Sequence, residues 1–216
     1  MDTTHENRGT PESARPGPAT EDHREVRAFF GARARAWDEK FPEDGPVFAA
    51  GVAEFGPRPG DRVLDAGCGT GRALAALRAA VGPEGLVVGA DLTPEMLDAA
   101  RAAGRDAEAA LLLADVARLP LADGTLDAVF ASGLIAHLAE PAANLRELAR
   151  VVAPGGRLCL FHPIGRAALA ARQGRRLTPE DLRDERNLGP LLAAGGWRMT
   201  SYSDVDERFL VLADRI

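Results

Sequence analysis

Three aspartates, Asp65, Asp91 and Asp115, each stand at the end of a short apolar run in this chain of 216 residues. Carboxylates accept hydrogen bonds from hydroxyl groups such as those of a ribose, and they attract cationic groups, so acids at strand ends could bind a ligand of either kind. Each also has an ordinary structural interpretation, because acids are common before helices and in turns. The segments around the three residues decide between these interpretations.

The first aspartate lies in segment 63–71, which reads Val-Leu-Asp-Ala-Gly-Cys-Gly-Thr-Gly. We expect a buried strand, a glycine turn and a helix starting near Thr70, whose unpaired N–H groups would face a ligand. Gly67, Gly69 and Gly71 leave the backbone open to close approach. A nicotinamide-binding turn usually reads G-x-G-x-x-G, whereas here the third glycine comes one residue early. A plain tight turn is the alternative.

Apolar runs alternate with helix-like segments from residue 62 onward. We expect strands over 62–66, 86–90, 111–114, 126–131 and 157–161, the last after a turn at 154–156. Helices are expected up to residue 81, from Pro94 with Thr93 as its cap, and over 141–152. Such alternation predicts a parallel sheet with helices on both faces. Strands over 197–203 and 208–213 would end the chain as a hairpin.

The segments before the alternating region differ in composition. Residues 1–20 are polar and rich in Pro and Gly, so we expect a disordered tail. The segment 21–58 should hold helices over 21–36 and 47–55, separated by Pro42 and Pro46. The main domain is expected over 59–216.

The motifs over roughly 62–161 resemble the class I S-adenosylmethionine-dependent methyltransferases. The resemblance implies a Rossmann-like α/β fold with a mostly parallel seven-stranded sheet, helices on both faces and an antiparallel C-terminal hairpin. It implies S-adenosylmethionine as cofactor and S-adenosylhomocysteine as product. Asp91 would bind the ribose, Asp115 the adenine amine, and the N–H of Val116 a ring nitrogen. The expected cofactor-binding residues are Asp65, Gly67, Cys68, Gly69, Gly71, Asp91, Leu92, Met96, Asp115, Val116, Ser132 and Gly133.

The acceptor is expected to be a small molecule. Segment 131–134 reads Ala-Ser-Gly-Leu, without the Asn- or Asp-Pro-Pro-aromatic motif of methylases that act on nucleobase or glutamine amino groups. The net charge of -6 argues against nucleic acid and anionic membranes. The histidines are not spaced like metal ligands. We expect a cytoplasmic protein without a membrane span, with a homodimer as the assembly considered.

Residues outside these motifs would form the acceptor side. His162 follows the fifth strand and could take a proton from a nucleophile, or simply be bonded to a loop. His137 is a second catalytic candidate, although a packing role is favoured. Arg166, in a basic run with Arg172, Arg175 and Arg176, could bind a carboxylate or form a solvated face. Segment 21–58 is expected to act as a lid, with Trp37 and Phe41 at the substrate and Phe29 and Phe30 packed on the core.

Methyl transfer to an O, N or C nucleophile, driven mainly by in-line positioning, is the function expected. Two alternatives stay open. One is an enzyme or accessory protein that binds S-adenosylmethionine without transferring methyl. The other is a nicotinamide-dependent oxidoreductase, which would share Asp91 but leaves the glycine spacing and Asp115 unexplained.

Overall fold

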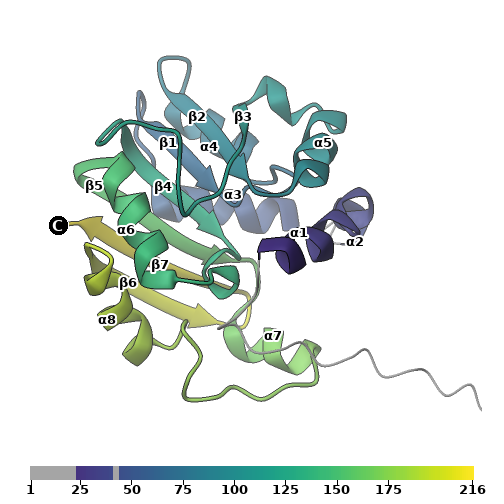
Figure 1. Ribbon diagram of the computed structural model, residues 1–216, viewed down its shortest axis with the longest axis vertical. Helices are drawn as coiled ribbons and strands as arrows, with labels where there is room; N and C mark the ends of the chain where they lie inside the picture. Colours follow the sequence, from purple (N-terminus) through teal and green to yellow (C-terminus); the bar gives the residue numbers. More distant parts are fainter. Residues whose placement is uncertain (1–22, 41–43) are drawn as a thin grey trace, which may run out of the picture.

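The described residues of the computed structural model, 23–40 and 44–216, contain one seven-stranded sheet (Figure 1). Its order is β3-β2-β1-β4-β5-β7-β6. The strands are β1 (Arg62–Ala66), β2 (Leu86–Asp91), β3 (Ala110–Leu113), β4 (Leu126–Ser132), β5 (Val152–His162), β6 (Trp197–Val205) and β7 (Arg208–Arg215). β7 runs antiparallel to β5 and β6, whereas the other pairs are parallel. The predicted fold class is confirmed, and the predicted tail over 1–20 lies outside the described residues.

Two layers of helices cover the sheet, because side chains alternate between its faces along each strand. On β4, Ala128 and Phe130 join the core beneath α3 (Asp44–Phe55) and α4 (Leu74–Val81). Val129 and Ala131 join the core beneath α6 (Pro141–Val151) and α8 (Glu185–Ala194). The central strands are therefore buried on both sides, as their continuous apolar runs predict.

Trp197 at the start of β6 anchors the second layer. Its side chain is fully buried, and its Nε1 donates a hydrogen bond to the carbonyl of Leu145 in α6 at 2.9 Å. Burying an aromatic side chain of this kind stabilises the fold by roughly 1.5–3 kcal/mol. The satisfied indole N–H avoids the penalty of an unpaired buried donor.

The helix after the glycine turn begins later than predicted. It starts at Leu74 rather than near Thr70. Gly67, Gly69 and Gly71 have φ values of 70°, 55° and 83°, so the chain is still turning where a helix would need negative φ. The unpaired N–H groups of a helix terminus are consequently displaced from this turn.

Before α5 (Pro94–Ala102), Thr93 occupies the N-cap position, but its side chain makes no cap hydrogen bond. The N–H of Thr93 instead donates a hydrogen bond to Asp91 Oδ1 at 2.8 Å. The cap position was thus predicted correctly, whereas the capping contact was not.

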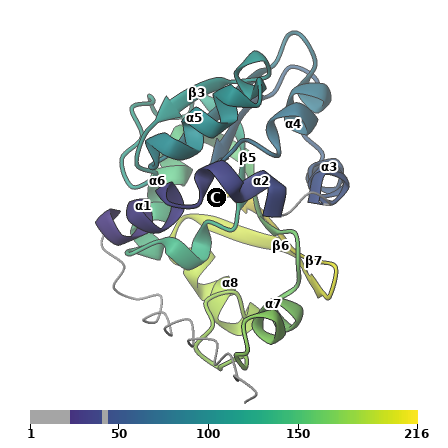
Figure 2. The same cartoon turned by 90° about the vertical axis from the view of Figure 1, so that its right-hand side faces the viewer.

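The N-terminal helix is also interrupted. Instead of one helix over 21–36, the chain forms α1 (His23–Gly31), the short η1 (Ala34–Ala36) and α2 (Trp37–Lys40). α3 begins at Asp44, so Pro46 lies inside its first turn, where a missing N–H is tolerated. α1 and α2 lie beyond the carboxyl ends of the parallel strands (Figures 1 and 2). We call residues 23–40 the lid segment.

The turn predicted at 154–156 is part of β5. The pairing with β4 shifts there, from Leu126 opposite Val152 to Ala128 opposite Arg157. Gly155 has a φ of 76°, which absorbs the extra residues as a bulge. After β5 the chain forms α7 (Arg166–Arg172) and a long connection to α8.

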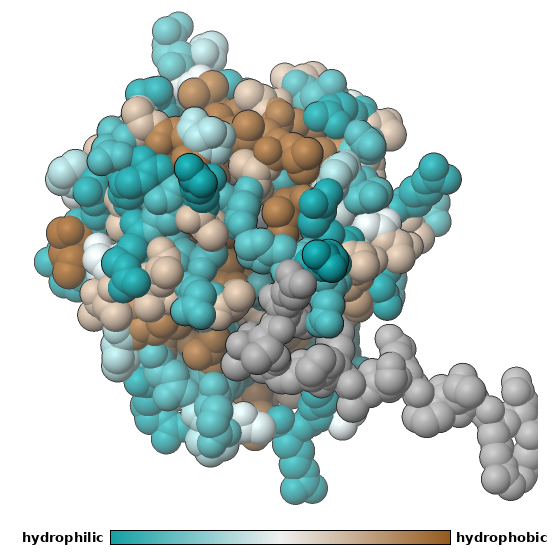
Figure 3. All heavy atoms as spheres, in the orientation of Figure 1, coloured by the Kyte–Doolittle hydropathy of each residue, from teal (hydrophilic) through white to brown (hydrophobic). Residues whose placement is uncertain are grey.

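The surface is mostly hydrophilic on the face drawn in Figure 3, with apolar residues in smaller groups. Over 23–40 and 44–216, no helix is both long and apolar enough to cross a bilayer.

Candidate cofactor and acceptor site

A cavity of about 1200 Å³ lies between the carboxyl ends of the parallel strands and the lid segment. Of the residues predicted to bind a cofactor, Gly71 alone does not line it. Residues distant in the sequence therefore meet at one edge of the sheet, as expected for an open α/β fold. The cavity-lining members of the predicted set are Asp65, Gly67, Cys68, Gly69, Asp91, Leu92, Met96, Asp115, Val116, Ser132 and Gly133.

The glycine turn, residues 67–71, is held against β2. The N–H of Gly67 donates to the carbonyl of Ala90 at 2.8 Å, and the N–H of Gly69 donates to Asp91 Oδ2 at 2.8 Å. A Cβ added to Gly69 would have Met96 Sδ, at 3.9 Å, as its neighbour within 4 Å. That side of the turn is therefore open to the cavity. Gly71 serves the turn itself, since a Cβ there would lie 2.7 Å from Leu74 Cδ1.

Asp65 is the penultimate residue of β1, behind this turn, and 1% of its surface is exposed. Within the part of the chain that the structure describes, its Oδ1 has no hydrogen-bond partner. Burial, followed by the charge of Asp91, raises the pKa of Asp65 to about 8. A buried carboxyl group with an unpaired oxygen is unfavourable unless a ligand completes it. The group suits a cationic ligand in the cavity.

Asp91 ends β2 and organises the turn. Its Oδ2 accepts from Gly69, and its Oδ1 accepts from the N–H of Thr93 at 2.8 Å. Burial raises the pKa of Asp91, against the opposing effect of these hydrogen bonds. A carboxylate has about four acceptor positions, so two remain for the hydroxyls of a ribose.

Asp115 follows β3 and also lines the cavity. Its Oδ1 accepts from the N–H of Ala117 at 2.8 Å, and its Oδ2 lies 3.2 Å from Nδ1 of His23 in α1. Sequence reasoning missed His23, because a lone histidine at the start of a helix carries no motif. The lid segment thus touches the acid that the resemblance places beside adenine.

A second contact ties the lid segment to the glycine turn. Asp38 of α2 accepts a hydrogen bond from Thr70 Oγ1 at 2.7 Å. Its Oδ2 lies 2.6 Å from Nη1 of Arg105, which also donates to the carbonyl of Thr70 at 2.6 Å. Asp38 and Arg105 were not predicted, since neither stands beside a recognisable motif.

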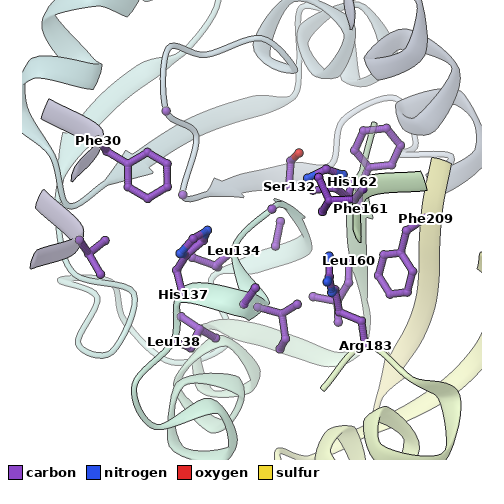
Figure 4. A pocket seen from close by; sticks show the side chains of 18 of the residues that line it. Phe30, Ser132, Leu134, His137, Leu138, Leu160, Phe161, His162, Arg183 and Phe209 are labelled. Carbon is purple, nitrogen blue, oxygen red and sulfur yellow. The ribbon is translucent and has the colours of Figure 1, made fainter. Parts of the chain in front are cut away.

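Aromatic residues of the lid segment line the cavity. Phe30 lies 5.1 Å from the ring of His137 and 5.6 Å from that of Trp37, between ring centroids. The expectation that Phe29 and Phe30 pack on the core is wrong, because α1 has no buried residue and both side chains line the cavity. Phe41 lies outside the described residues. Figure 4 shows Phe30 and His137 on one side of the cavity.

His162 lies on the other side, near Ser132 (Figure 4). Its Nδ1 is 2.9 Å from the carbonyl oxygen and 3.2 Å from the nitrogen of Ile164. Burial is the main cause that lowers the pKa of His162 to about 4. The imidazole is therefore neutral at neutral pH. The ring is bonded to a loop, as one of the two interpretations expects, and it also lines the cavity. Its part in proton transfer stays a prediction.

Arg166 does not line the cavity. Its guanidinium is buried against Asp181 and Asp184, each at 3.3 Å, and donates to the hydroxyl of Tyr202 at 2.9 Å. The other arginines of the predicted basic run, Arg172, Arg175 and Arg176, do line it. So does Arg183, which sequence reasoning missed. The described ranges hold no group of three His, Cys, Asp or Glu side chains arranged to bind a metal ion.

Comparison with known proteins agrees with this geometry. A family model described as "Methyltransferase domain" matches residues 64–160. The chain is 30% identical over 177 residues to a demethylmenaquinone methyltransferase of Beutenbergia cavernae, covering 70% of this chain and 71% of that protein. Other curated relatives match more locally, and the matches span 31% to 42% of their length.

Solved structures share the fold. A SAM-dependent methyltransferase from Aquifex aeolicus superposes with a TM-score of 0.66 at 26% identity, covering 91% of this chain and all of that one. The [4+2]-cyclase SpnF gives a TM-score of 0.72 at 18% identity, covering 93% of this chain and 99% of its own. The cavity, with its cation-attracting Asp65 and its glycine turn, fits S-adenosylmethionine. The chain belongs to the class I S-adenosylmethionine-dependent methyltransferases.

Proposed function

We propose that this protein transfers a methyl group from S-adenosylmethionine to a small-molecule acceptor. The observation that carries the proposal is Asp65, a buried carboxyl group with an unpaired oxygen that lines the cavity behind an open glycine turn. S-adenosylmethionine supplies an activated methyl group on a positively charged sulfonium. Asp65 and Asp91 would hold the charged and ribose parts of the cofactor, and Asp115 would hold the adenine.

The protein must also position the acceptor relative to the methyl group. A sulfonium is already a good leaving group, so the nucleophile must chiefly be held in line with the methyl carbon and sulfur. Correct placement of two reactants can lower a barrier by roughly 7–11 kcal/mol in favourable cases. Phe30, Trp37 and Phe161 supply apolar walls for an acceptor and exclude water. These contacts favour an acceptor with an apolar body.

Two histidines are candidates for proton transfer. His162 is neutral at neutral pH and can accept a proton from a hydroxyl or amine nucleophile, although its low pKa makes it a weak base. His137 packs edge-on against Phe30, which favours a supporting role. We therefore assign catalysis mainly to positioning, with His162 as an assisting group.

The lid segment would close the site. His23 at its start contacts Asp115, and Asp38 at its end contacts Thr70 of the glycine turn. Both contacts are made to cofactor-side residues, while the aromatic face between them lines the cavity. Cofactor binding can therefore change the position of the lid segment and, with it, the shape of the acceptor pocket.

A small-molecule acceptor is supported by the relative from Beutenbergia cavernae, whose name gives demethylmenaquinone as its substrate. A second candidate function comes from SpnF, a cyclase with the same fold. The fold alone thus does not require methyl transfer, and a reaction that leaves the methyl group on the cofactor is the competing proposal. Cytoplasmic location and a homodimer stay predictions.

The test uses S-adenosylmethionine carrying an isotopic label in its methyl group. The protein is incubated with a set of small hydroxy, amino and enolic acceptors, and products are analysed by mass spectrometry. Methyl transfer predicts label in a product, with equal release of S-adenosylhomocysteine, and loss of both in Asp91→Ala. Product formation without label would favour the cyclase-like alternative. Oxidation of NADH, added to a parallel incubation with the same acceptors, would favour an oxidoreductase.

A further inference from the structure

Charges of opposite sign line different parts of the cavity. Asp65, Asp91 and Asp115 lie at the ends of the strands, where the cationic cofactor is expected. The wall formed by the last residue of α7 and the segment after it instead carries arginines. We call Arg172, Arg175, Arg176 and Arg183 the arginine wall. A cavity with this separation favours a cation at one end and an anion at the other.

Arg183 is the least exposed member of the arginine wall. Its side chain is 14% exposed, and its Nε and Nη2 each lie 3.2 Å from an oxygen of Asp181. These contacts occupy one edge of the guanidinium. Within residues 23–40 and 44–216, the hydrogen bonds of the Arg183 guanidinium are made by Nε and Nη2, and Nη1 makes none. Arg183 therefore keeps donors that can reach a molecule in the cavity.

A comparison of Arg183 with Arg186 shows that the local turn does not by itself place an arginine in the cavity. Arg186 repeats the same arrangement one turn later, with its Nε 2.9 Å and its Nη2 3.2 Å from the oxygens of Asp184. In both cases the arginine follows its aspartate by two residues and donates its backbone N–H to it. Yet Arg186 is 79% exposed and does not line the cavity. The turn alone thus does not require the arginine to line the cavity.

Neighbouring groups hold Arg183 in place. Asp181 also lies 3.3 Å from Nε of Arg166, and the backbone carbonyl of Arg183 accepts a hydrogen bond from Tyr202 at 2.9 Å. Such support reduces the entropy that an arginine loses when it binds a ligand. Figure 4 shows the Arg183 side chain beside Leu160 and Phe209, on the same side of the cavity as His162. An apolar surface and a fixed cation are thus adjacent.

The other three arginines lie at the exposed end of this wall. No ion pair is recorded for Arg172, Arg175 or Arg176 across residues 23–40 and 44–216, although Arg175 donates to the side chain of Gln173. Glu180 and Asp181 are the acidic residues of this wall, and Asp181 is already shared by Arg166 and Arg183. The wall therefore keeps an excess of positive charge toward the cavity.

We propose that the methyl acceptor carries an oxyanion group, a carboxylate or a phosphate, that is bound by Arg183 beside an apolar body. Arg172, Arg175 and Arg176 attract the anion to the open end of the cavity. This inference rests on the proposed function and names the substrate class of the same site. Arg183 is a binding residue in this account, and it also determines acceptor specificity.

The test measures binding to protein saturated with S-adenosylhomocysteine. Benzoate, phenyl phosphate and benzamide, with their naphthalene counterparts, are titrated by calorimetry and by ligand-observed NMR. A charged hydrogen bond predicts that an anionic probe binds about 10- to 100-fold more tightly than its neutral amide. Stronger binding of the carboxylate or of the phosphate identifies which oxyanion the wall prefers. Arg183→Gln should remove the preference.

Arg186→Gln is the matched control, because it removes the equivalent arginine outside the cavity. It should leave the preference for anions unchanged. Arg183→Lys keeps the positive charge but lacks the paired N–H donors of the guanidinium, so it should retain a part of the preference for anions. This variant tests the assignment even if Arg183→Gln folds poorly. Thermal unfolding and S-adenosylhomocysteine affinity are measured for each variant.

The outcomes separate the two proposals. Equal binding of acids and amides, no binding of any acid, or a preference that survives in Arg183→Gln would overturn the assignment of Arg183. Methyl transfer to neutral acceptors alone would do the same while leaving the proposed function intact. Failure of the protein to bind S-adenosylhomocysteine would instead contradict the proposed function itself.

Discussion

Asp38 in the lid segment accepts a hydrogen bond of 2.7 Å from Thr70 in the glycine turn, although the two residues lie 32 positions apart in the sequence. Arg105 contacts both of them, at 2.6 Å in each case. The element expected to cover the acceptor is thereby connected to the loop expected to hold the cofactor. Binding of the cofactor at the glycine turn should therefore stabilise the position of the lid segment over the acceptor pocket.

This connection predicts that Asp38→Asn weakens S-adenosylhomocysteine binding by about 2- to 10-fold, the size of one or two hydrogen bonds. The effect is modest because Asp38 is partly exposed, and solvent screens its ion pairs. Asp98→Asn, which removes an exposed partner of Arg101, is the control and should bind as the wild type does. Equal affinity in all three proteins would show that the contact does not couple lid and turn.

Asp65 should destabilise the ligand-free protein at alkaline pH. Its folded pKa of about 8 lies above the ordinary value of 3.8, so the folded state retains a proton that the unfolded state releases. The associated stability is complete below about pH 4 and is lost as pH rises toward about 8. Asp65→Asn keeps a neutral side chain and should be more stable at pH 8 by about 2–5 kcal/mol. Denaturant unfolding at several pH values compares the two proteins.

The same carboxyl group predicts how cofactor binding depends on pH. The ammonium group that S-adenosylhomocysteine shares with S-adenosylmethionine would pair with the ionised form of Asp65, so binding must release the proton that the free protein holds. Affinity for S-adenosylhomocysteine should therefore rise by up to about tenfold per pH unit between about pH 6 and pH 7.5. Calorimetry in buffers of different ionisation enthalpy detects the released proton. A pH-independent affinity, or the same slope in Asp65→Asn, would contradict this assignment.

His162 should destabilise the folded protein at acidic pH, whereas Asp65 does so at alkaline pH. Its folded pKa of about 4 lies below the ordinary value of 6.5, so folding excludes a proton that the unfolded chain takes up. Stability is thus lost as pH falls from about 6.5 toward about 4, by about 1–3 kcal/mol. His162→Gln should remove this loss. With an acceptor in hand, the variant also tests the assisting role, since an unchanged kcat over all pH values would exclude proton transfer by His162.

Much of the sheet could be predicted because its strands are short apolar runs that end in recognisable turns. Asp65 and Asp91 could be located because each stands beside such a run. The start of α4 was misplaced because three positive-φ glycines prolong the turn, a property of the folded backbone that helix propensity does not describe. The break between α1 and η1 follows from how the lid segment wraps over the cavity, which depends on contacts with distant residues.

Arg183 could not be distinguished from Arg186 in the sequence, since both follow an aspartate by two residues. Their different exposure, 14% against 79%, arises from the path of the connection between α7 and α8. Phe29 and Phe30 were misassigned for a similar reason. An aromatic pair on a helix indicates that an apolar surface is nearby, but not whether that surface is a core or a cavity wall.

The central claim is that the glycine turn and its aspartates bind S-adenosylmethionine rather than a nicotinamide. Calorimetric titration of S-adenosylhomocysteine and NADH into the wild type and Asp91→Ala tests it most directly, with thermal unfolding as a check on folding. The account predicts micromolar binding of S-adenosylhomocysteine to the wild type, loss of that binding in Asp91→Ala, and no binding of NADH. Binding of NADH, or of neither ligand, would contradict it.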